Sequence, residues 1–192
     1  MTRALFIVDV QNDFTEGGAL GVNGGDAVAA GITKHLAEHA TEYAIIVASR
    51  DWHNAVGDNG GHFALAPAEP DFIDSWPVHC VAGTDGAAYD PLLDTHAITH
   101  HLYKGQGKPD YSLFQGVTDA GQTAAGLLEA NGITDVDVVG IATDHCVRAS
   151  ALDALGTGVR VRVLTDLIAG VAPVSSVAAL DELAAAGAQI VA

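Results

Sequence analysis

The chain has 192 residues, of which 49% are hydrophobic, and it is typical of one globular domain spanning residues 1–192. Twenty-four acidic residues against eight Lys and Arg give a formal net charge of -16, which argues against nucleic acid or an anionic membrane surface as a partner. No stretch approaches the roughly 20 apolar residues of a membrane span and no signal-peptide pattern is present, so we expect a cytoplasmic protein.

The first part of the chain alternates strand, helix and strand. Residues 5–10 are apolar enough for a buried strand, and a glycine-rich loop follows over residues 17–25. Val28, Ile32 and Leu36 recur every four residues and predict a helix with one apolar face. Residues 43–48 then predict a second buried strand.

Residues 52–94 lose this periodicity over a span far longer than the usual connection of about 4–6 residues. Disordered segments are poor in aromatic residues, whereas this one contains Trp52, Phe63, Phe72, Trp76 and Tyr89. We therefore predict an ordered loop that covers a site.

The remainder continues the alternation. Strands are predicted over residues 97–103, 138–142, 159–164 and 189–191, and the helices between them carry Leu127 and Leu128, then Val147, Ala151 and Leu155, then Val177, Leu180 and Leu183. The whole pattern predicts a three-layer α/β/α fold with a doubly wound, mostly parallel six-stranded sheet, whose sites gather at the carboxyl ends of the strands.

Reactive side chains follow four of these strands. Asp9 closes the first strand, Asp51 follows the second, Lys104 follows the third, and Cys146 follows the fourth. Each of these residues alone has a commoner structural role, such as a buried thiol or a solvated strand end. Together, at adjacent strand ends of one sheet, they favour catalysis.

Cys146 is predicted to lie in the first turn of a helix that Thr143 and Asp144 cap. The helix dipole and the cation of Lys104 would lower the thiol's pKa, so we expect a thiolate to form easily. Backbone N–H groups around Ala142 and Cys146 would stabilise an oxyanion. His145 adjoins the cysteine, but neighbouring helical residues do not face each other, so it is expected in a pocket wall.

The long loop also carries candidate metal ligands. Asp51 and His53 are two residues apart, which points both side chains the same way in an extended segment. His62 and His79 follow, and imidazoles with one carboxylate suit one divalent zinc, iron or manganese ion better than calcium. Cys80 could be a further soft ligand but fits packing better, and it is expected to stay unpaired with Cys146.

Five separated segments carry specific motifs: VDVQNDF over residues 8–14, DWH over 51–53, WPVHCVAGTDGA over 76–87, YKG over 103–105 and GIATDHCV over 140–147. In order and in type they resemble the nicotinamidase/pyrazinamidase branch of the isochorismatase-like cysteine hydrolases. The resemblance extends over nearly the whole chain.

The resemblance implies an amidohydrolase that converts nicotinamide, and pyrazinamide, to the carboxylate and ammonia, in the salvage of NAD. The implied triad is Asp9, Lys104 and Cys146, in which Cys146 forms a thioester and Asp9 moves the proton. Backbone N–H groups of Ala142 and Cys146 would form the oxyanion hole, with a cis peptide bond before Ala142.

The resemblance also assigns binding residues. Asp51, His53 and His79 would hold the metal, and His62 matches a further ligand of some relatives, within a run richer in glycine than expected. The pocket for the substrate ring would be lined by Phe14, Leu20, Trp76, Tyr111, Ala142 and His145. Monomeric and homo-oligomeric states both remain open.

Three alternatives differ in chemistry. An isochorismatase cleaves a vinyl ether without needing a metal or a thiol, and both DWH and Cys146 speak against it. A related cysteine hydrolase could act on another small amide, such as an N-carbamoyl group. A non-catalytic thiol sensor or binding protein on the same fold would not need all of Asp9, Lys104 and Cys146.

Overall fold

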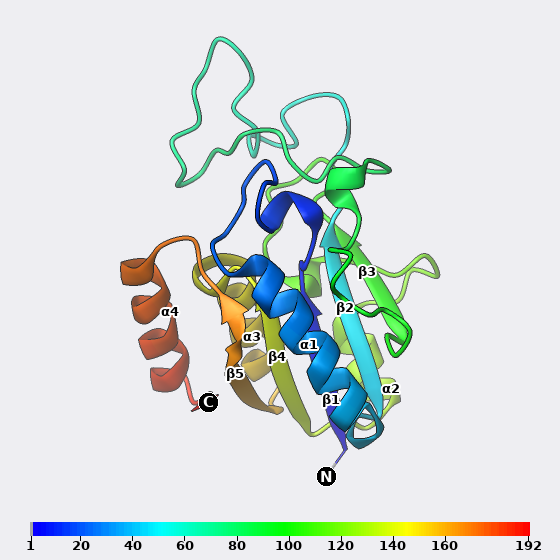
Figure 1. Ribbon diagram of the computed structural model, residues 1–192. Coiled ribbons are helices and arrows are strands. Elements are labelled where there is room, and N and C mark those ends of the chain that lie inside the picture. Colours follow the sequence, from blue (N-terminus) through cyan, green and yellow to red (C-terminus); the bar gives the residue numbers. More distant parts are fainter. Residues whose placement is uncertain (1) are drawn as a thin grey trace.

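The computed structural model describes residues 2–192, and these form a six-stranded sheet in which every pair of neighbouring strands is parallel (Figure 1). The strands lie in the order β3-β2-β1-β4-β5-β6. Their bounds are β1 (Arg3–Val8), β2 (Ile45–Asp51), β3 (His100–Lys104), β4 (Asp135–Ile141), β5 (Arg160–Ala169) and β6 (Gln189–Val191). The predicted doubly wound α/β sheet is confirmed, and it is parallel throughout.

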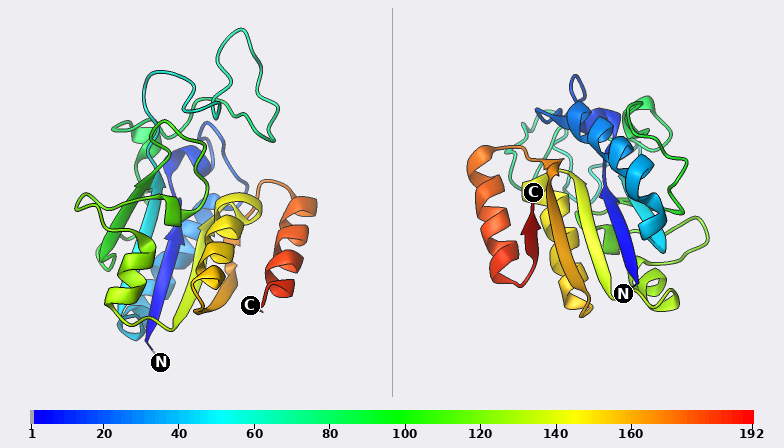
Figure 2. Two further views of the ribbon diagram at one scale, coloured as in Figure 1. Left: turned by 180° about the vertical axis from the view of Figure 1, so that it is seen from behind. Right: turned by 60° about the horizontal axis from the view of Figure 1, so that its bottom comes forward.

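Helices cover both faces of the sheet (Figure 2). One face packs against α1 (Gly25–His39), and the other packs against α2 (Ala124–Ala130), α3 (Arg148–Gly156) and α4 (Pro173–Ala185). Short helical turns complete the chain: η1 (Asn12–Phe14), η2 (Ala40–Glu42), η3 (Asp85–Ala87), η4 (Leu113–Gln115) and the π-helical turn η5 (Thr143–Val147).

The core follows from the period-two alternation of the strands. Leu5 and Ile7 of β1 pack toward α1, whereas Phe6 and Val8 pack into the opposite layer, and all four are fully buried. Burial on both faces explains why β1 reads as a continuous apolar run. Each such side chain contributes about 1.5–3 kcal/mol when removed from water.

Two helices test the predicted apolar stripes. Val28, Ile32 and Leu36 of α1 are buried as their spacing predicts. On α4 the prediction is partly wrong, because Val177 is 60% exposed, whereas Leu183 is fully buried. Val177, Leu180 and Leu183 are three residues apart, so each step falls about 60° short of a full helical turn and the three side chains do not share one face.

Strand bounds differ from the predicted ones where the backbone turns. The first strand ends at Val8 because Asp9 adopts a φ of 49°, outside the β region. The second strand extends to Asp51, which pairs with Lys104 of β3. The third strand begins only at His100.

The strand order reverses between β1 and β4, so the carboxyl ends of these two strands border a crevice. The irregular segment between β2 and β3 lies over this end of the sheet, drawn in cyan to green above the strands in Figure 1. Among the described residues, no helix combines the length and apolar character needed to cross a membrane.

Candidate active site

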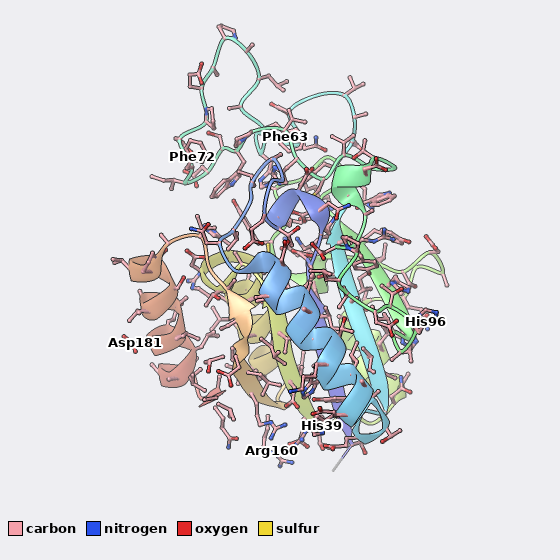
Figure 3. The ribbon with its side chains drawn as sticks, viewed as in Figure 1. His39, Phe63, Phe72, His96, Arg160 and Asp181 are labelled. Carbon is pink, nitrogen blue, oxygen red and sulfur yellow. The ribbon has the colours of Figure 1, made fainter. Side chains whose placement is uncertain are left out.

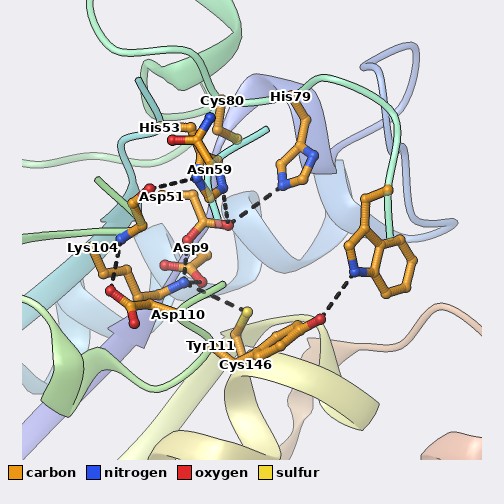
Figure 4. Close-up of polar contacts among 12 residues, drawn as sticks. Asp9, Asp51, His53, Asn59, His79, Cys80, Lys104, Asp110, Tyr111 and Cys146 are labelled. Carbon is orange, nitrogen blue, oxygen red and sulfur yellow. Dashed lines mark hydrogen bonds and ion pairs between the residues drawn. The ribbon is translucent and has the colours of Figure 1, made fainter. Parts of the chain in front are cut away.

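The strand ends bring the predicted reactive residues together (Figure 4). The Lys104 Nζ atom lies 2.8 Å from Asp9 Oδ2 and 3.7 Å from Cys146 Sγ, and it also binds Asp51 Oδ1. All four residues are buried. One ammonium group therefore sits among a thiol and two carboxylates, of which Asp51 is also a candidate metal ligand.

The charges of this cluster are set by burial and by each other. Burial alone would lower the pKa of Lys104, but Asp51 and Asp9 raise that pKa well above its ordinary value. Burial raises the pKa of Asp9, and Lys104 opposes the rise. The lysine is thus a permanent cation, whereas Asp9 is a carboxylate with an increased affinity for a proton.

The prediction that a Cys146 thiolate forms easily is wrong for the free site. Burial raises the pKa of the Cys146 thiol well above its ordinary value; Lys104 lowers it, and Asp9 and Asp51 raise it further. The sequence indicated the cation of Lys104, but it did not show how completely the thiol is buried. Deprotonation of the thiol must therefore be coupled to proton uptake nearby.

Cys146 lies in η5, between β4 and α3. The predicted capping by Thr143 and Asp144 is wrong, because Ala142 is the N-cap and no side-chain cap is formed. Asp144 instead accepts hydrogen bonds from the start of α4, namely from Val171 N–H, Ala172 N–H and the Ser175 hydroxyl, at 2.9, 3.2 and 2.5 Å. The peptide bond between Ile141 and Ala142 is cis, as the resemblance implies.

Gly140 lets β4 approach β1 at this end of the sheet. Its φ is 115°, and a Cβ atom there would lie 2.1 Å from the Val8 carbonyl oxygen. Only glycine fits this position, so the turn that carries Cys146 begins close to Asp9.

A second cluster adjoins the first. Asp51, His53, His62 and His79 are buried, and one potential ligand atom from each lies within 4.8 Å of the others. The Nε2 atoms of His53 and His79 are 3.5 and 3.7 Å from Asp51 Oδ2. The structure thus brings together all four predicted ligands. They include His62, although the sequence around it is richer in glycine than the resemblance leads one to expect.

The hydrogen bonds of these rings fit a metal ion. Nδ1 of His53 is 2.8 Å from the Gly105 carbonyl, and Nδ1 of His79 is 2.7 Å from the Pro77 carbonyl. A carbonyl only accepts, so each Nδ1 carries the hydrogen, which leaves Nε2 as the atom with the lone pair when the ring serves as a metal ligand. Nε2 of His53 and Nδ1 of His62 are buried without a hydrogen-bond partner. Lone pairs that converge on a carboxylate need a cation between them.

Two further features support this donor set. Burial, with the nearby His79 and His53, lowers the pKa of His62 to about 3, which leaves its ring neutral and able to donate a lone pair. Gly105 has a φ of 84°, and a Cβ atom there would lie 2.5 Å from Cε1 of the His53 ring. The glycine after Lys104 therefore makes room for His53.

A cavity of about 290 Å³ opens beside both clusters. All six residues predicted for the ring pocket line it: Phe14, Leu20, Trp76, Tyr111, Ala142 and His145, together with Cys146, Asp51, His62 and His79. Trp76 Nε1 donates to the Tyr111 hydroxyl at 3.0 Å, and its ring meets His145 edge to face at 5.1 Å. The walls are those of a slot for a flat aromatic ring.

Sequence reasoning missed several lining residues, namely Ala19, Gly21, Val22, Phe72 and Val171. Phe72 could have been found, because it belongs to the aromatic set of the long loop; Figure 3 shows it on that loop, above the sheet. Val171 gave no signal, since it precedes α4 outside any periodic segment; its N–H donates to Asp144, in the turn that carries Cys146.

Cys80 lies outside both clusters. It is buried and free, as predicted, and its Sγ atom is 3.9 Å from the Gly86 carbonyl. It does not line the cavity. Its side chain therefore contributes packing.

A family model described as the isochorismatase domain matches residues 3–192, and the chain therefore belongs to the isochorismatase family. The nicotinamidase/pyrazinamidase of Mycobacterium tuberculosis is 50% identical over 189 residues, which cover 98% of each chain. The pyrazinamidase of Pyrococcus horikoshii in complex with zinc superposes with a TM-score of 0.82 at 37% identity, covering 100% of this chain and 99% of that one. PnC1 from L. infantum in complex with nicotinate superposes with a TM-score of 0.82 at 35% identity, covering 99% of this chain and 92% of that one.

Proposed function

We propose that this chain is a metal-assisted nicotinamidase that hydrolyses nicotinamide, and pyrazinamide, to the corresponding carboxylate and ammonia. The observation that carries the proposal is the buried cluster of Asp9, Lys104 and Cys146, which meets an aromatic cavity beside a set of Asp and His ligands. The relatives named above, with zinc and nicotinate among their complexes, support the same assignment.

The reaction begins with proton transfer from the Cys146 thiol to Asp9. The sulfur attacks the carboxamide carbon, and the proton passes from Asp9 to the departing ammonia as the C–N bond breaks. This leaves a thioester, which water cleaves to the carboxylate while Asp9 accepts a proton from the water and returns one to the sulfur. Lys104 holds the charges of Asp9 and the sulfur in place.

The backbone N–H groups of Ala142 and Cys146 are the proposed donors to the oxyanion that forms after attack. Each donor of this kind is worth about 2.7–4 kcal/mol in the transition state. Ala142 and Cys146 both border the cavity, so the carboxamide of a substrate bound there would lie next to this turn.

Asp51, His53, His62 and His79 would hold one divalent metal, and zinc, iron and manganese all suit this donor set. When bound, the ion supplies an anchor for the pyridine nitrogen, directly or through water. Phe14, Leu20, Trp76, Tyr111 and His145 enclose the ring and exclude water from it. With this substrate the chain would act in the salvage of NAD, as a cytoplasmic enzyme.

Ammonia release from nicotinamide tests the proposal. We expect wild type to be active, and Cys146→Ala to lose at least about 1000-fold in kcat because no nucleophile remains. Cys80→Ala is the matched control, since it removes the other buried thiol and should keep activity. A chelator should abolish turnover by wild type, and added metal should restore it.

The outcomes separate the parts of the proposal. Undiminished turnover by Cys146→Ala would overturn the cysteine mechanism. Full activity in a protein shown to be free of metal would overturn only the role of the metal. Wild type that binds nicotinamide without releasing ammonia would favour a binding protein on this fold.

A further inference from the structure

The side chain of Gln11 is fully buried and pairs with the backbone of Asp51. Its Oε1 atom accepts a hydrogen bond from Asp51 N–H at 2.8 Å, and its Nε2 donates to the Asp51 carbonyl at 2.9 Å. The same Nε2 donates to the Ala87 carbonyl at 3.0 Å. The amide thus satisfies both backbone groups of one candidate metal ligand.

Asp51 has no strand partner on the side of β1. The pairing between β1 and β2 ends at Ile7 and Ala48, and the chain then turns away at Asp9. On its other side Asp51 pairs with Lys104 of β3. The Gln11 amide therefore takes the place of the missing strand and holds Asp51 from the side that would otherwise be unpaired.

The same segment also holds the part of the loop next to His79. Asp13 Oδ2 accepts a hydrogen bond from Cys80 N–H at 2.7 Å, one residue beyond His79. A Cβ atom on Gly86 would lie 2.2 Å from this oxygen, so only glycine allows the contact. Residues 11–13 thus connect two ligand-bearing segments to the end of β1, which Asp9 follows.

We propose that Gln11 is a positioning residue that sets the affinity of the site for its metal by fixing the backbone of Asp51. The inference rests on the metal site proposed above. Gln11 does not line the cavity and is not among the clustered ligands, and Asp51 is the one candidate ligand to which its side chain is hydrogen-bonded. Partners that orient metal ligands typically contribute about 10- to 100-fold to affinity.

The test is the dissociation constant of Zn²⁺, measured by competition with a chromophoric chelator, for wild type, Gln11→Met and Gln11→Asn. Methionine keeps the length but forms none of the three hydrogen bonds, and asparagine keeps the amide but is too short to reach Asp51. We expect both to bind Zn²⁺ about 10- to 100-fold more weakly. At saturating Zn²⁺, kcat for nicotinamide should recover to within about threefold of wild type, because the reacting groups are unchanged.

Asn12→Ala is the matched control, since the Asn12 amide donates to the carbonyl of Asp85, which is not a candidate ligand, at 2.7 Å. We expect its Zn²⁺ affinity to equal that of wild type. Circular dichroism and the urea midpoint identify any variant that does not fold, and Gln11→Asn then carries the test if Gln11→Met fails.

Three results would overturn the inference. Zn²⁺ affinities of both Gln11 variants equal to that of wild type would show that the amide does not position Asp51. An equal loss in Asn12→Ala would show that any damage to this segment has the same effect. Wild type that binds no Zn²⁺ would remove both this inference and the metal site beneath it, whereas the first two results leave the proposed reaction intact.

Discussion

Lys104 is a charged side chain with no exposed surface, and its burial is offset by two carboxylates. Removing one partner from such a buried group leaves an uncompensated charge, which is more costly than never having buried the pair. The cluster therefore stabilises the fold only as a unit. The same arrangement keeps an ammonium group beside the Cys146 sulfur, where a thiolate would need one.

Asp144 shows a comparable link between stability and the site. Burial would raise its pKa, but hydrogen bonds from the Ser175 hydroxyl and from the Val171 and Ala172 N–H groups hold that pKa below its ordinary value. Because the pKa is lower in the folded state, the carboxylate stabilises the fold above its unfolded pKa, and this stabilisation is lost as the pH falls through the folded value.

We expect Asp144→Asn to lower the free energy of unfolding by about 1–2 kcal/mol at neutral pH. The difference from wild type should shrink as the pH falls below about 4, where the wild-type carboxylate takes up a proton. Urea unfolding at a series of pH values measures this difference. Ser175→Ala, which removes one of the three donors, should show a smaller effect; a difference independent of pH would contradict the assignment.

At the scale of elements, the long loop between β2 and β3 supplies the outer wall of the cavity. Asp71 Oδ1 accepts hydrogen bonds from the N–H groups of Ile73, Asp74 and Ser75, each at 2.9 Å. This turn holds Phe72 at a φ of 58°, with its ring edge to face with Trp76 at 6.2 Å. A non-glycine residue in that conformation is held there by its surroundings.

Phe72→Ala should raise KM for nicotinamide about fivefold with kcat nearly unchanged, since about 1 kcal/mol of apolar contact at the cavity mouth is lost. Steady-state kinetics measure the split between the two constants. Ile73→Ala is the control, because Ile73 is 73% exposed and does not line the cavity. Equal increases in KM from Phe72→Ala and Ile73→Ala would show that KM depends on the loop as a whole rather than on the Phe72 ring.

At the scale of the whole molecule, a third polar cluster, around Asp137, connects distant segments at the opposite end of the sheet. Asp137 of β4 is fully buried and accepts two hydrogen bonds from Arg162 of β5, at 2.7 and 2.6 Å. The hydroxyl of Tyr43, just before β2, donates to the same carboxylate at 2.9 Å, and Arg3 of β1 lies 3.8 Å away. Four segments from across the chain meet at one carboxylate.

Arg162→Ala should therefore reduce the free energy of unfolding by about 2–4 kcal/mol, because it leaves Asp137 buried and poorly paired. Arg160→Ala is the comparison, since Arg160 binds Asp135 in the same way but is 57% exposed, and it should cost less than about 1 kcal/mol. Chemical denaturation measures both. Similar losses for the two arginines would contradict the role of burial.

The sequence by itself determined the succession of strands and helices along the chain, the parallel sheet, and which reactive residues lie at the carboxyl ends of its strands. It could do so because side-chain periodicity and the geometry of parallel strands are local properties. Motifs likewise pointed to Asp51, His53 and His79 as ligands and to six residues of the ring pocket, all of which the fold brings to one place.

Only the tertiary structure decided what depends on depth and on contacts between distant segments. Burial beside two carboxylates raises the pKa of the Cys146 thiol, although its predicted place in the first turn of a helix, near Lys104, indicated a lowered pKa. Asp144 turned out to hold the start of α4 rather than its own turn, and Gln11 to pair with Asp51, forty residues away. Desolvation and long-range hydrogen bonds arise only when the chain is folded, so no local pattern records them.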